Sequence, residues 1–274
     1  MANQKAFFVD ISTTENVNRC PIEFSYCIMD FDDFINNQNL KEKIETIQII
    51  PDEDITLNGT FSTNLIYSKI NKINYTGIDL NTALKQIYAL LKNAIDEKMY
   101  IVGFCHGKFD LAILNETFKR VLNYEMLDYD LNYYIDIQAL AKKCITDDLS
   151  LKFSRSCIFL KLMFDNYAGQ KARLSILNNL RQSIGSKNEL YISMLILKML
   201  CKKNSFSDFS KIATALNTIT TVTVMPIGKY KGMKIADIQK KDFEYLVWMF
   251  NNIPDLRIKN SDLYATLNSI VNIS

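Results

Sequence analysis

The feature that most constrains the fold is a set of three apolar segments that precede any helical periodicity. They are KAFFVDIS (residues 5–12), PIEFSYCIMDF (21–31) and KIETIQIIP (43–51). Their aromatic and β-branched residues predict buried strands, and the turn-like ENVNRCP between the first two predicts antiparallel pairing. The chain is therefore expected to begin with an antiparallel sheet.

Helices and strands alternate after these segments. Apolar positions at helical spacing predict a helix within 77–98, with Asp79 as its N-cap. MYIVGFC (99–105) predicts a strand, 108–122 a helix, and 132–144 a short strand that enters a helix. This order predicts an α/β fold with a mixed sheet flanked by helices.

The composition changes near residue 219. TITTVTVMPIGKYKGMKI (218–235) is rich in Thr and Val and contains two glycines, which predicts a β-hairpin. Helices are expected in 241–252 and 262–273. We therefore expect two domains: a larger α/β domain over 1–218, and a small α+β module of a hairpin and helices over 219–274.

Composition excludes some classes of protein. The 274 residues contain no apolar run long enough for a membrane span, and the first residues lack the pattern of a secretory signal. Six scattered cysteines without a Cys-x-x-Cys pair are typical of reduced thiols, so a cytoplasmic location is expected. The single histidine excludes any site that needs two.

Charge is unevenly distributed along the chain. Residues 1–149 contain 14 Lys and Arg against 22 Asp and Glu, whereas residues 150–203 contain 10 against 2. A basic block of this size is typical of a face that binds a polyanion. The alternative is a solvated helical surface that balances the acidic half of the chain.

The first apolar segment resembles the opening motif of the DEDD (DnaQ-like) 3′–5′ exonucleases, which share an RNase H-like fold. In that motif a strand ends in Asp-x-Glu-Thr-Thr-Gly, and the next strand begins Ile-x-Glu-Ile. FFVDISTTE places Asp10 on the family's Asp, Ser12 on its Glu and Glu15 on its Gly, and PIEFSY supplies the second strand.

VGFCHGKFDLAIL (102–114) is similar to the second motif, VGHNxxFDxxFL. Asp110 falls on the family's metal-binding Asp, and His106 stands where the family has Asn. In YIDIQALAKK, Asp136 has a family counterpart that is not usually a metal ligand.

The third motif, His-x-Ala-x-x-Asp, is expected within 185–200. Alignment by the apolar face places Asn188 on the histidine and Ser193 on the aspartate, whereas a shift by one residue gives Glu189 and Met194. The C-terminal MPIGKYKGMKI and YLVW resemble the Pro-x-Gly-Lys-Tyr-Lys-Gly module that follows the nuclease domain in some exodeoxyribonuclease X-like proteins.

The resemblance implies two-metal hydrolysis of phosphodiester bonds, with four carboxylates as ligands and a histidine as general base. Here two of the four carboxylates and the histidine are replaced, by Ser12, Ser193 and Asn188. Hydroxyl and amide groups bring no negative charge to a divalent ion. We therefore expect a degenerate site in which Asp10 and Asp110 bind Mg²⁺ or Mn²⁺ weakly, and no cofactor is required if the protein is inactive.

Substituted ligands remain an alternative. Glu15 lies five residues beyond Asp10, and Glu189 lies on the late helix, so either could replace a missing carboxylate. His106 could act as a displaced base, or it could form hydrogen bonds only within its own loop.

The C-terminal hairpin offers a nucleic-acid-binding surface. Residues 225–241 contain five lysines against one aspartate, and Lys229, Tyr230, Lys231 and Lys234 combine charge with an aromatic ring. This combination is typical of contact with single strands. The alternative is that the glycines only shape a turn and Tyr230 packs inward. Trp248 and Phe250, at helical spacing with Tyr245, are expected in the core.

Three hypotheses follow. The first is an exonuclease-like protein without catalysis that binds nucleic acid, single-stranded DNA rather than RNA, or acts as a structural partner in a replication or phage assembly. If it is phage-encoded, its location is the host cytoplasm or the virion. The second is an active metal-dependent 3′–5′ exonuclease with non-standard ligands. The third is a protein-interaction module that does not bind nucleic acid.

Overall fold

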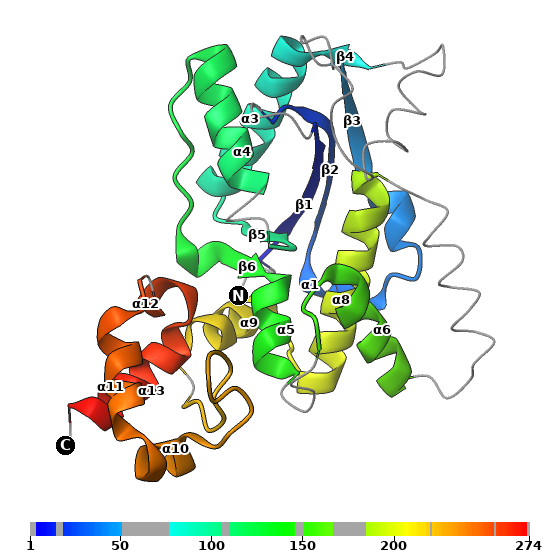
Figure 1. Ribbon diagram of the computed structural model, residues 1–274. Coiled ribbons are helices and arrows are strands. Elements are labelled where there is room, and N and C mark those ends of the chain that lie inside the picture. The colour runs from blue at the N-terminus through cyan, green and yellow to red at the C-terminus, as the bar shows by residue number, and fades with distance from the viewer. Residues whose placement is uncertain are drawn as a thin grey trace. The chain divides into compact units, whose positions relative to one another are not determined.

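The computed structural model describes residues 4–14, 19–50, 77–105, 110–145, 151–166, 185–219, 221–254 and 256–272 (Figure 1). The strands form one mixed sheet in the order β4-β3-β2-β1-β5-β6. Their bounds are β1 (Ala6–Thr13), β2 (Pro21–Met29), β3 (Glu45–Ile50), β4 (Ile78–Asp79), β5 (Tyr100–Gly103) and β6 (Tyr134–Asp136). β1, β2 and β3 pair antiparallel, whereas β5 and β6 join in parallel. The predicted fold class is confirmed.

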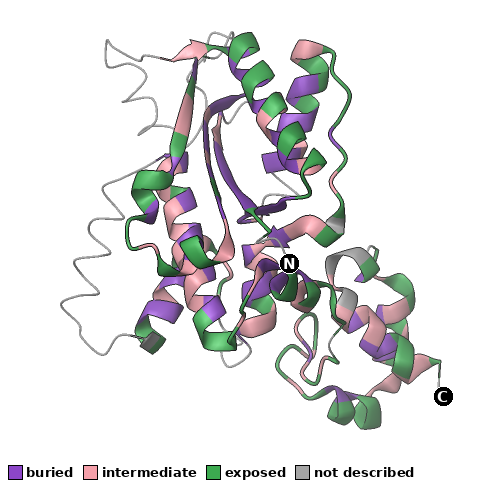
Figure 2. Ribbon diagram, turned by 180° about the vertical axis from the view of Figure 1, so that it is seen from behind, coloured by how far each residue is buried: buried purple, intermediate pink, exposed green. Residues whose placement is uncertain are grey.

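β1 lies in the middle of the sheet and is buried over most of its length (Figure 2). Phe8 is opposite Cys27 of β2 and Val102 of β5. The ladder with β5 ends at Phe8, while the ladder with β2 continues and pairs Asp10 with Ser25. Asp10 therefore lies just beyond the end of β5, where the sheet is open on that side.

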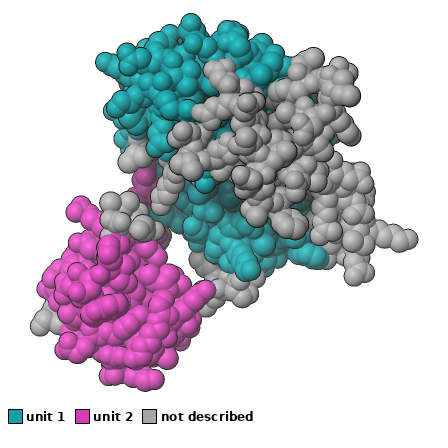
Figure 3. Space-filling view, turned by 45° about the horizontal axis from the view of Figure 1, so that its top comes forward, with its two compact units in different colours: residues 1–145, 151–215 teal, residues 146–150, 216–274 magenta. Residues whose placement is uncertain are grey.

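The chain divides into two compact units (Figure 3). Residues 1–145 with 151–215 form the larger unit, and residues 146–150 with 216–274 form the smaller one. The larger unit contains the sheet and the helices α1 (Phe31–Asn36), α3 (Leu80–Asp96), α4 (Asp110–Thr117), α5 (Ile137–Cys144), α6 (Arg155–Asn166), α8 (Ser186–Asn204) and most of α9 (Phe209–Asn217). It also contains three short non-α helices, η1 (Leu40–Lys43), η3 (Phe118–Leu122) and η4 (Leu131–Tyr133). That 1–218 and 219–274 fold separately stays a prediction.

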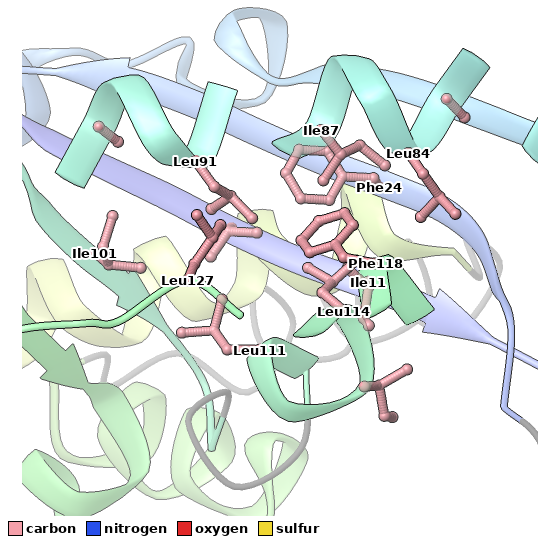
Figure 4. Packing of buried hydrophobic residues seen from close by; sticks show 14 of the residues in the cluster. Ile11, Phe24, Leu84, Ile87, Leu91, Ile101, Leu111, Leu114, Phe118 and Leu127 are labelled. Carbon is pink, nitrogen blue, oxygen red and sulfur yellow. The ribbon is translucent and has the colours of Figure 1, made fainter. Parts of the chain in front are cut away.

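One face of the sheet carries the main hydrophobic core. Alternate residues of β1 point to this face, where α3, α4 and η3 supply the facing apolar side chains (Figure 4). The largest members of the cluster include Phe7, Phe24, Leu84, Ile87, Leu91, Leu114 and Phe118. Asp79 caps α3 as predicted, since its carboxylate accepts from the N–H of Thr82 at 2.9 Å.

The opposite face of β1 carries Phe8, Asp10 and Ser12. Phe8 packs against Phe34 and Phe209, with ring centroids 5.0 and 5.9 Å apart. Further along the strand the residues become polar, and α8 packs across β1 and β2. The two-residue period of the strand thus places Asp10 and Ser12 under α8.

The smaller unit is mainly helical. It contains α10 (Ile235–Lys241), α11 (Phe243–Asn252), α12 (Leu256–Lys259) and α13 (Ser261–Val271). Its own core is built from Met225, Ile235, Ile238, Leu246, Met249, Leu256, Leu263 and Leu267. None of the helices in the described parts of either unit is long and apolar enough to cross a membrane.

The predicted hairpin is reduced to a single antiparallel bridge between Val224 and Lys234. Met225 donates to the carbonyl of Met233, and Gly232 donates back to Met225, both at 2.8 Å. The ladder stops there because Pro226 has no N–H to donate, and the chain then turns through Gly228 and Gly232 at positive φ.

Candidate active site and nucleic-acid interface

Asp10 is the most deeply buried carboxylate of the candidate site, with 2% of its surface exposed. Burial raises the pKa of Asp10 to about 7, although the guanidinium of Arg155 lowers it. Oδ1 accepts a hydrogen bond from Arg155, whereas Oδ2 has no hydrogen-bond partner among the described residues. Buried polar atoms are rarely left unpaired, so Oδ2 marks a position that favours a proton or a cation.

Asp110 is the first residue of α4 and is 5% exposed. Burial raises its pKa well above the ordinary value, and the negative charge of Asp10 raises it further. Its Oδ2 also has no hydrogen-bond partner in the described parts of the chain. The two carboxylates singled out by the sequence therefore lie close enough to repel one another.

Arg155, the first residue of α6, enters this acidic pocket. One terminal nitrogen of its guanidinium pairs with Asp10 and the other with Glu189 of α8. Its guanidinium also lies over the ring of Phe104, 4.9 Å from the centroid. Burial lowers the pKa of Arg155, but Asp10, Glu189 and Asp110 together outweigh burial and raise it. Arg155 is thus a fixed positive charge held between two carboxylates.

Asn188 and Ser193, which stand at the predicted histidine and aspartate positions of the third motif, both lie on α8, and neither is charged. Ser193 is fully buried, and its hydroxyl donates to the carbonyl of Glu189 at 2.9 Å, one turn back along the helix. Asn188 is half-buried, and its Oδ1 has no hydrogen-bond partner among the described residues. Neither side chain can accept a proton from water as a histidine does, which is what a general base requires.

Ser12, which stands at the position of the family's glutamate, forms a hydrogen bond with an acidic residue. Its hydroxyl donates to Oε2 of Glu23, on the paired strand β2, at 3.4 Å. The same oxygen accepts the backbone N–H of Ser186 at 3.0 Å, at the start of α8. Glu23 thereby holds the first turn of α8 against the sheet, where a carboxylate is favoured by the helix dipole.

Other residues of the predicted motifs act structurally or lie outside the described residues. Asp136 caps α5, because its Oδ1 accepts from the N–H groups of Gln138 and Ala139 at 2.8 and 3.1 Å. Glu15 and His106 lie outside the described residues, so substitution of a ligand by Glu15 and the role of His106 stay predictions.

The side chains do not fit the divalent ions that the resemblance implies. In the parts of the chain that the structure describes, no three His, Cys, Asp or Glu side chains are grouped so that they could hold a metal ion. Mg²⁺ needs several hard oxygen ligands around it, whereas here a guanidinium lies between Asp10 and Glu189. The prediction that Asp10 and Asp110 bind Mg²⁺ or Mn²⁺ weakly stays a prediction.

The smaller unit contains a cluster of Lys229, Tyr230, Tyr245 and Trp248; Lys231 belongs to the same turn as Lys229, and Lys234 follows that turn. Trp248 is 52% exposed, so its predicted place in the core is wrong. Its ring stacks on that of Tyr245 at 6.1 Å, while the ammonium of Lys229 lies 5.8 Å from the Tyr245 centroid. Lys231 and Lys234 are exposed.

The ring of Tyr230 is less accessible to a stacking base than the ring of Trp248. Its hydroxyl donates to Asp242 at 2.6 Å, and its half-buried ring meets Tyr245 edge-on at 5.0 Å. Lys229 also pairs with Asp242 at 3.0 Å. Phe250 is half-buried against Tyr264, in agreement with its expected place in the core.

The comparisons with known proteins agree with this architecture. Residues 228–253 match the family described as exodeoxyribonuclease X-like C-terminal. The chain is similar to the zinc-ion-bound form of Escherichia coli exonuclease I in complex with single-stranded DNA, with a TM-score of 0.50 and 13% identity over 74% of this chain. The fold of this chain is therefore similar to that of exonuclease I. The chain covers 42% of that exonuclease I chain.

A second solved structure, the RNase domain of the yeast Pop2 protein, is similar to this chain at 13% identity and a TM-score of 0.44, over 76% of this chain and 80% of that one. No curated protein sequence matches. The predicted resemblance to DnaQ-like exonucleases with an exodeoxyribonuclease X-like C-terminal module is confirmed. The degenerate state of the active site stays a prediction.

The sequence motifs miss two residues that contribute to the acidic pocket and to the surface of the smaller unit. Arg155 lies between the second and third motifs, and no periodicity or motif singles it out. Trp248 was assigned to the core because helical spacing alone does not distinguish the two sides of a short helix. The sequence signal that could have identified it is a single tryptophan that follows a lysine-rich stretch, residues 229–241.

Proposed function

We propose that this chain is an exonuclease-like protein that binds single-stranded nucleic acid, DNA rather than RNA, without hydrolysing it. Binding is assigned to the surface of the smaller unit around Lys229, Tyr230, Lys231, Lys234 and Trp248. The preference for DNA rests on the resemblance to exodeoxyribonuclease X-like proteins.

The observation that carries the absence of hydrolysis is the position of Arg155 in the acidic pocket. Its guanidinium pairs with Asp10 and Glu189, and uncharged Asn188 and Ser193 stand at the general-base and ligand positions of the motif. Loss of one such group costs roughly two to four powers of ten in rate. Several losses in one site leave little catalysis, although their effects are not additive.

The observation that supports binding is the exposed ring of Trp248 next to Tyr245 and Lys229. Bases stack on exposed aromatic rings, and each stacked base contributes about 1–3 kcal/mol. Exposed Lys231 and Lys234 suit the phosphates that flank a stacked base.

The basic block of residues 150–203 supports the binding proposal less well. Arg155 is used inside the pocket, Lys161 pairs with Asp165 at 2.9 Å, and Lys198 donates to the carbonyl of Asn37 at 2.9 Å. Arg155 and Lys161 are therefore already paired with carboxylates within the larger unit, and Lys198 is held by a backbone carbonyl.

Hydrolysis is tested with end-labelled single-stranded DNA in Mg²⁺ or Mn²⁺. We expect no loss of label beyond that seen without protein. Loss of label that disappears in Asp10→Ala would identify an active exonuclease with non-standard ligands.

Binding is tested by fluorescence anisotropy with labelled oligo(dT) and oligo(U) of equal length. Trp248→Ala should weaken binding of oligo(dT) by about 1–3 kcal/mol, since one stacking ring is lost. The double variant Lys231→Ala, Lys234→Ala should reduce the salt slope by about 1.4, at roughly 0.7 per phosphate contact on a single strand. Lys92→Ala, an exposed lysine of α3, is the matched control and should bind as the wild type does.

The alternative of a protein-interaction module has its own outcome in this assay. If the wild type does not bind either oligonucleotide at low salt, the binding proposal fails and an acidic protein partner becomes the better hypothesis.

A further inference from the structure

Among the described residues, Arg155 is the cation that pairs with carboxylates of the acidic pocket in the larger unit. Asp10 and Asp110 are almost fully buried, and each has one oxygen without a hydrogen-bond partner among the described residues. Glu189 and Glu23 lie near enough to act on Asp10 electrostatically. Buried carboxylates are costly unless a cation or a proton accompanies them.

Arg155 meets this requirement from within the chain. Its guanidinium spans Asp10 and Glu189 and lies over Phe104. The side chain is 17% exposed, and Glu189, at 49%, forms the outer side of the pocket. A planar guanidinium with five fixed donors suits two separate carboxylates better than a lysine ammonium does.

We propose that the guanidinium of Arg155 takes the place of a divalent cation in this pocket, so that the wild-type pocket binds Mg²⁺ and Mn²⁺ more weakly than the same pocket from which Arg155 has been removed. A divalent ion and a guanidinium would compete for the same carboxylate oxygens, and their positive charges would repel one another. The proposal concerns the larger unit alone and does not depend on nucleic-acid binding.

The replacement has a mechanical consequence for the larger unit. Arg155 begins α6, Asp10 lies on β1, and Glu189 lies in the first turn of α8. One side chain therefore ties two helices to the central strand, which in a metal-dependent site is the task of the ion and its ligands. The wild-type fold should not need a metal to keep these elements together.

The test uses the full chain and Mn²⁺ alone, added after treatment with a chelator and its removal by dialysis. Binding is measured by isothermal titration and by the electron paramagnetic resonance signal of free Mn²⁺, and stability by thermal unfolding. Arg155→Met should lower the melting temperature without metal and recover part of the loss in Mn²⁺, because a ligand that binds only the folded state stabilises it. The melting temperature of the wild type should not rise in Mn²⁺. The wild type should bind Mn²⁺ about tenfold or more weakly than Arg155→Met does.

Matched variants separate this proposal from a simple ion pair. Lys152→Met removes the same charge from an exposed position three residues away, and should remain as insensitive to Mn²⁺ as the wild type. Asp10→Asn combined with Arg155→Met should abolish the gained Mn²⁺ binding. Arg155→Lys keeps the positive charge and should therefore not gain Mn²⁺ binding.

Three outcomes overturn the proposal: wild type that binds Mn²⁺ as tightly as Arg155→Met, a folded Arg155→Met that gains no binding, or gained binding that survives Asp10→Asn. If Arg155→Met does not fold, Arg155→Gln provides the same measurement, because its amide still donates to a carboxylate without supplying charge.

Discussion

The raised pKa of Asp10 predicts how the stability of the larger unit changes with pH. Asp10 is 2% exposed, and burial raises its pKa from 3.8 to about 7 even though Arg155 lowers it. In the folded protein the carboxyl group therefore binds a proton more tightly than in the unfolded chain. Its contribution to stability is complete below about pH 4 and is lost as pH rises through about 7.

The magnitude follows from the size of the shift. A shift of about three pH units corresponds to about 4 kcal/mol, at roughly 1.4 kcal/mol per unit. The free energy of unfolding of the wild type, relative to that of Asp10→Asn, should therefore fall by about this amount between pH 4 and pH 8. The asparagine stays neutral throughout, so the difference between the two proteins isolates Asp10 and its coupling to Asp110.

Urea denaturation followed by far-ultraviolet circular dichroism, at intervals of one pH unit in a chelator, measures this difference. Asp96→Asn, which removes an exposed carboxylate paired with Lys92, is the control and should keep the pH dependence of the wild type. Parallel curves for wild type and Asp10→Asn would refute the reasoning, because they would show that Asp10 binds its proton equally well in both states.

Further predictions concern single positions. Gly228→Ala should destabilise the smaller unit by about 2 kcal/mol or more, because φ is +77° and the added carbon would lie 2.2 Å from the hydroxyl of Tyr245. Gly232→Ala, at φ +89° in open space, should cost only about 1 kcal/mol; both are measured by urea denaturation followed by the fluorescence of Trp248, the single tryptophan. Asp136→Ala should lower the stability of the larger unit by about 1 kcal/mol through loss of the α5 cap, measured by circular dichroism, and leave DNA binding unchanged. Phe34→Ala should cost about 3–5 kcal/mol in the same assay, because its ring is fully buried.

The sheet was predictable because local patterns determine it. The alternation along β1 assigns Phe7, Val9 and Ile11 to one face and Phe8 and Asp10 to the other, and the structure follows that division. The hairpin of the smaller unit was overestimated: Thr and Val favour strands, but Pro226 and the two glycines limit the pairing to one bridge.

The candidate site was predictable only in part. Motif spacing singled out Asp10 and Asp110, and the structure brings their charges close together. Arg155 was not predictable, because its contact with Asp10 joins residues 145 positions apart and depends on where α6 begins. No periodic signal in a sequence reports such a pairing.

The position of Arg155 also bears on how this pocket could change in evolution. A cation that is part of the polypeptide cannot be diluted, chelated or exchanged. If Arg155 takes the place of an ion as proposed, a carboxylate introduced by Ser12→Glu or Ser193→Asp would not by itself create a two-metal site. The arginine would have to be lost as well, so a single substitution would not convert this pocket into a metal-dependent one.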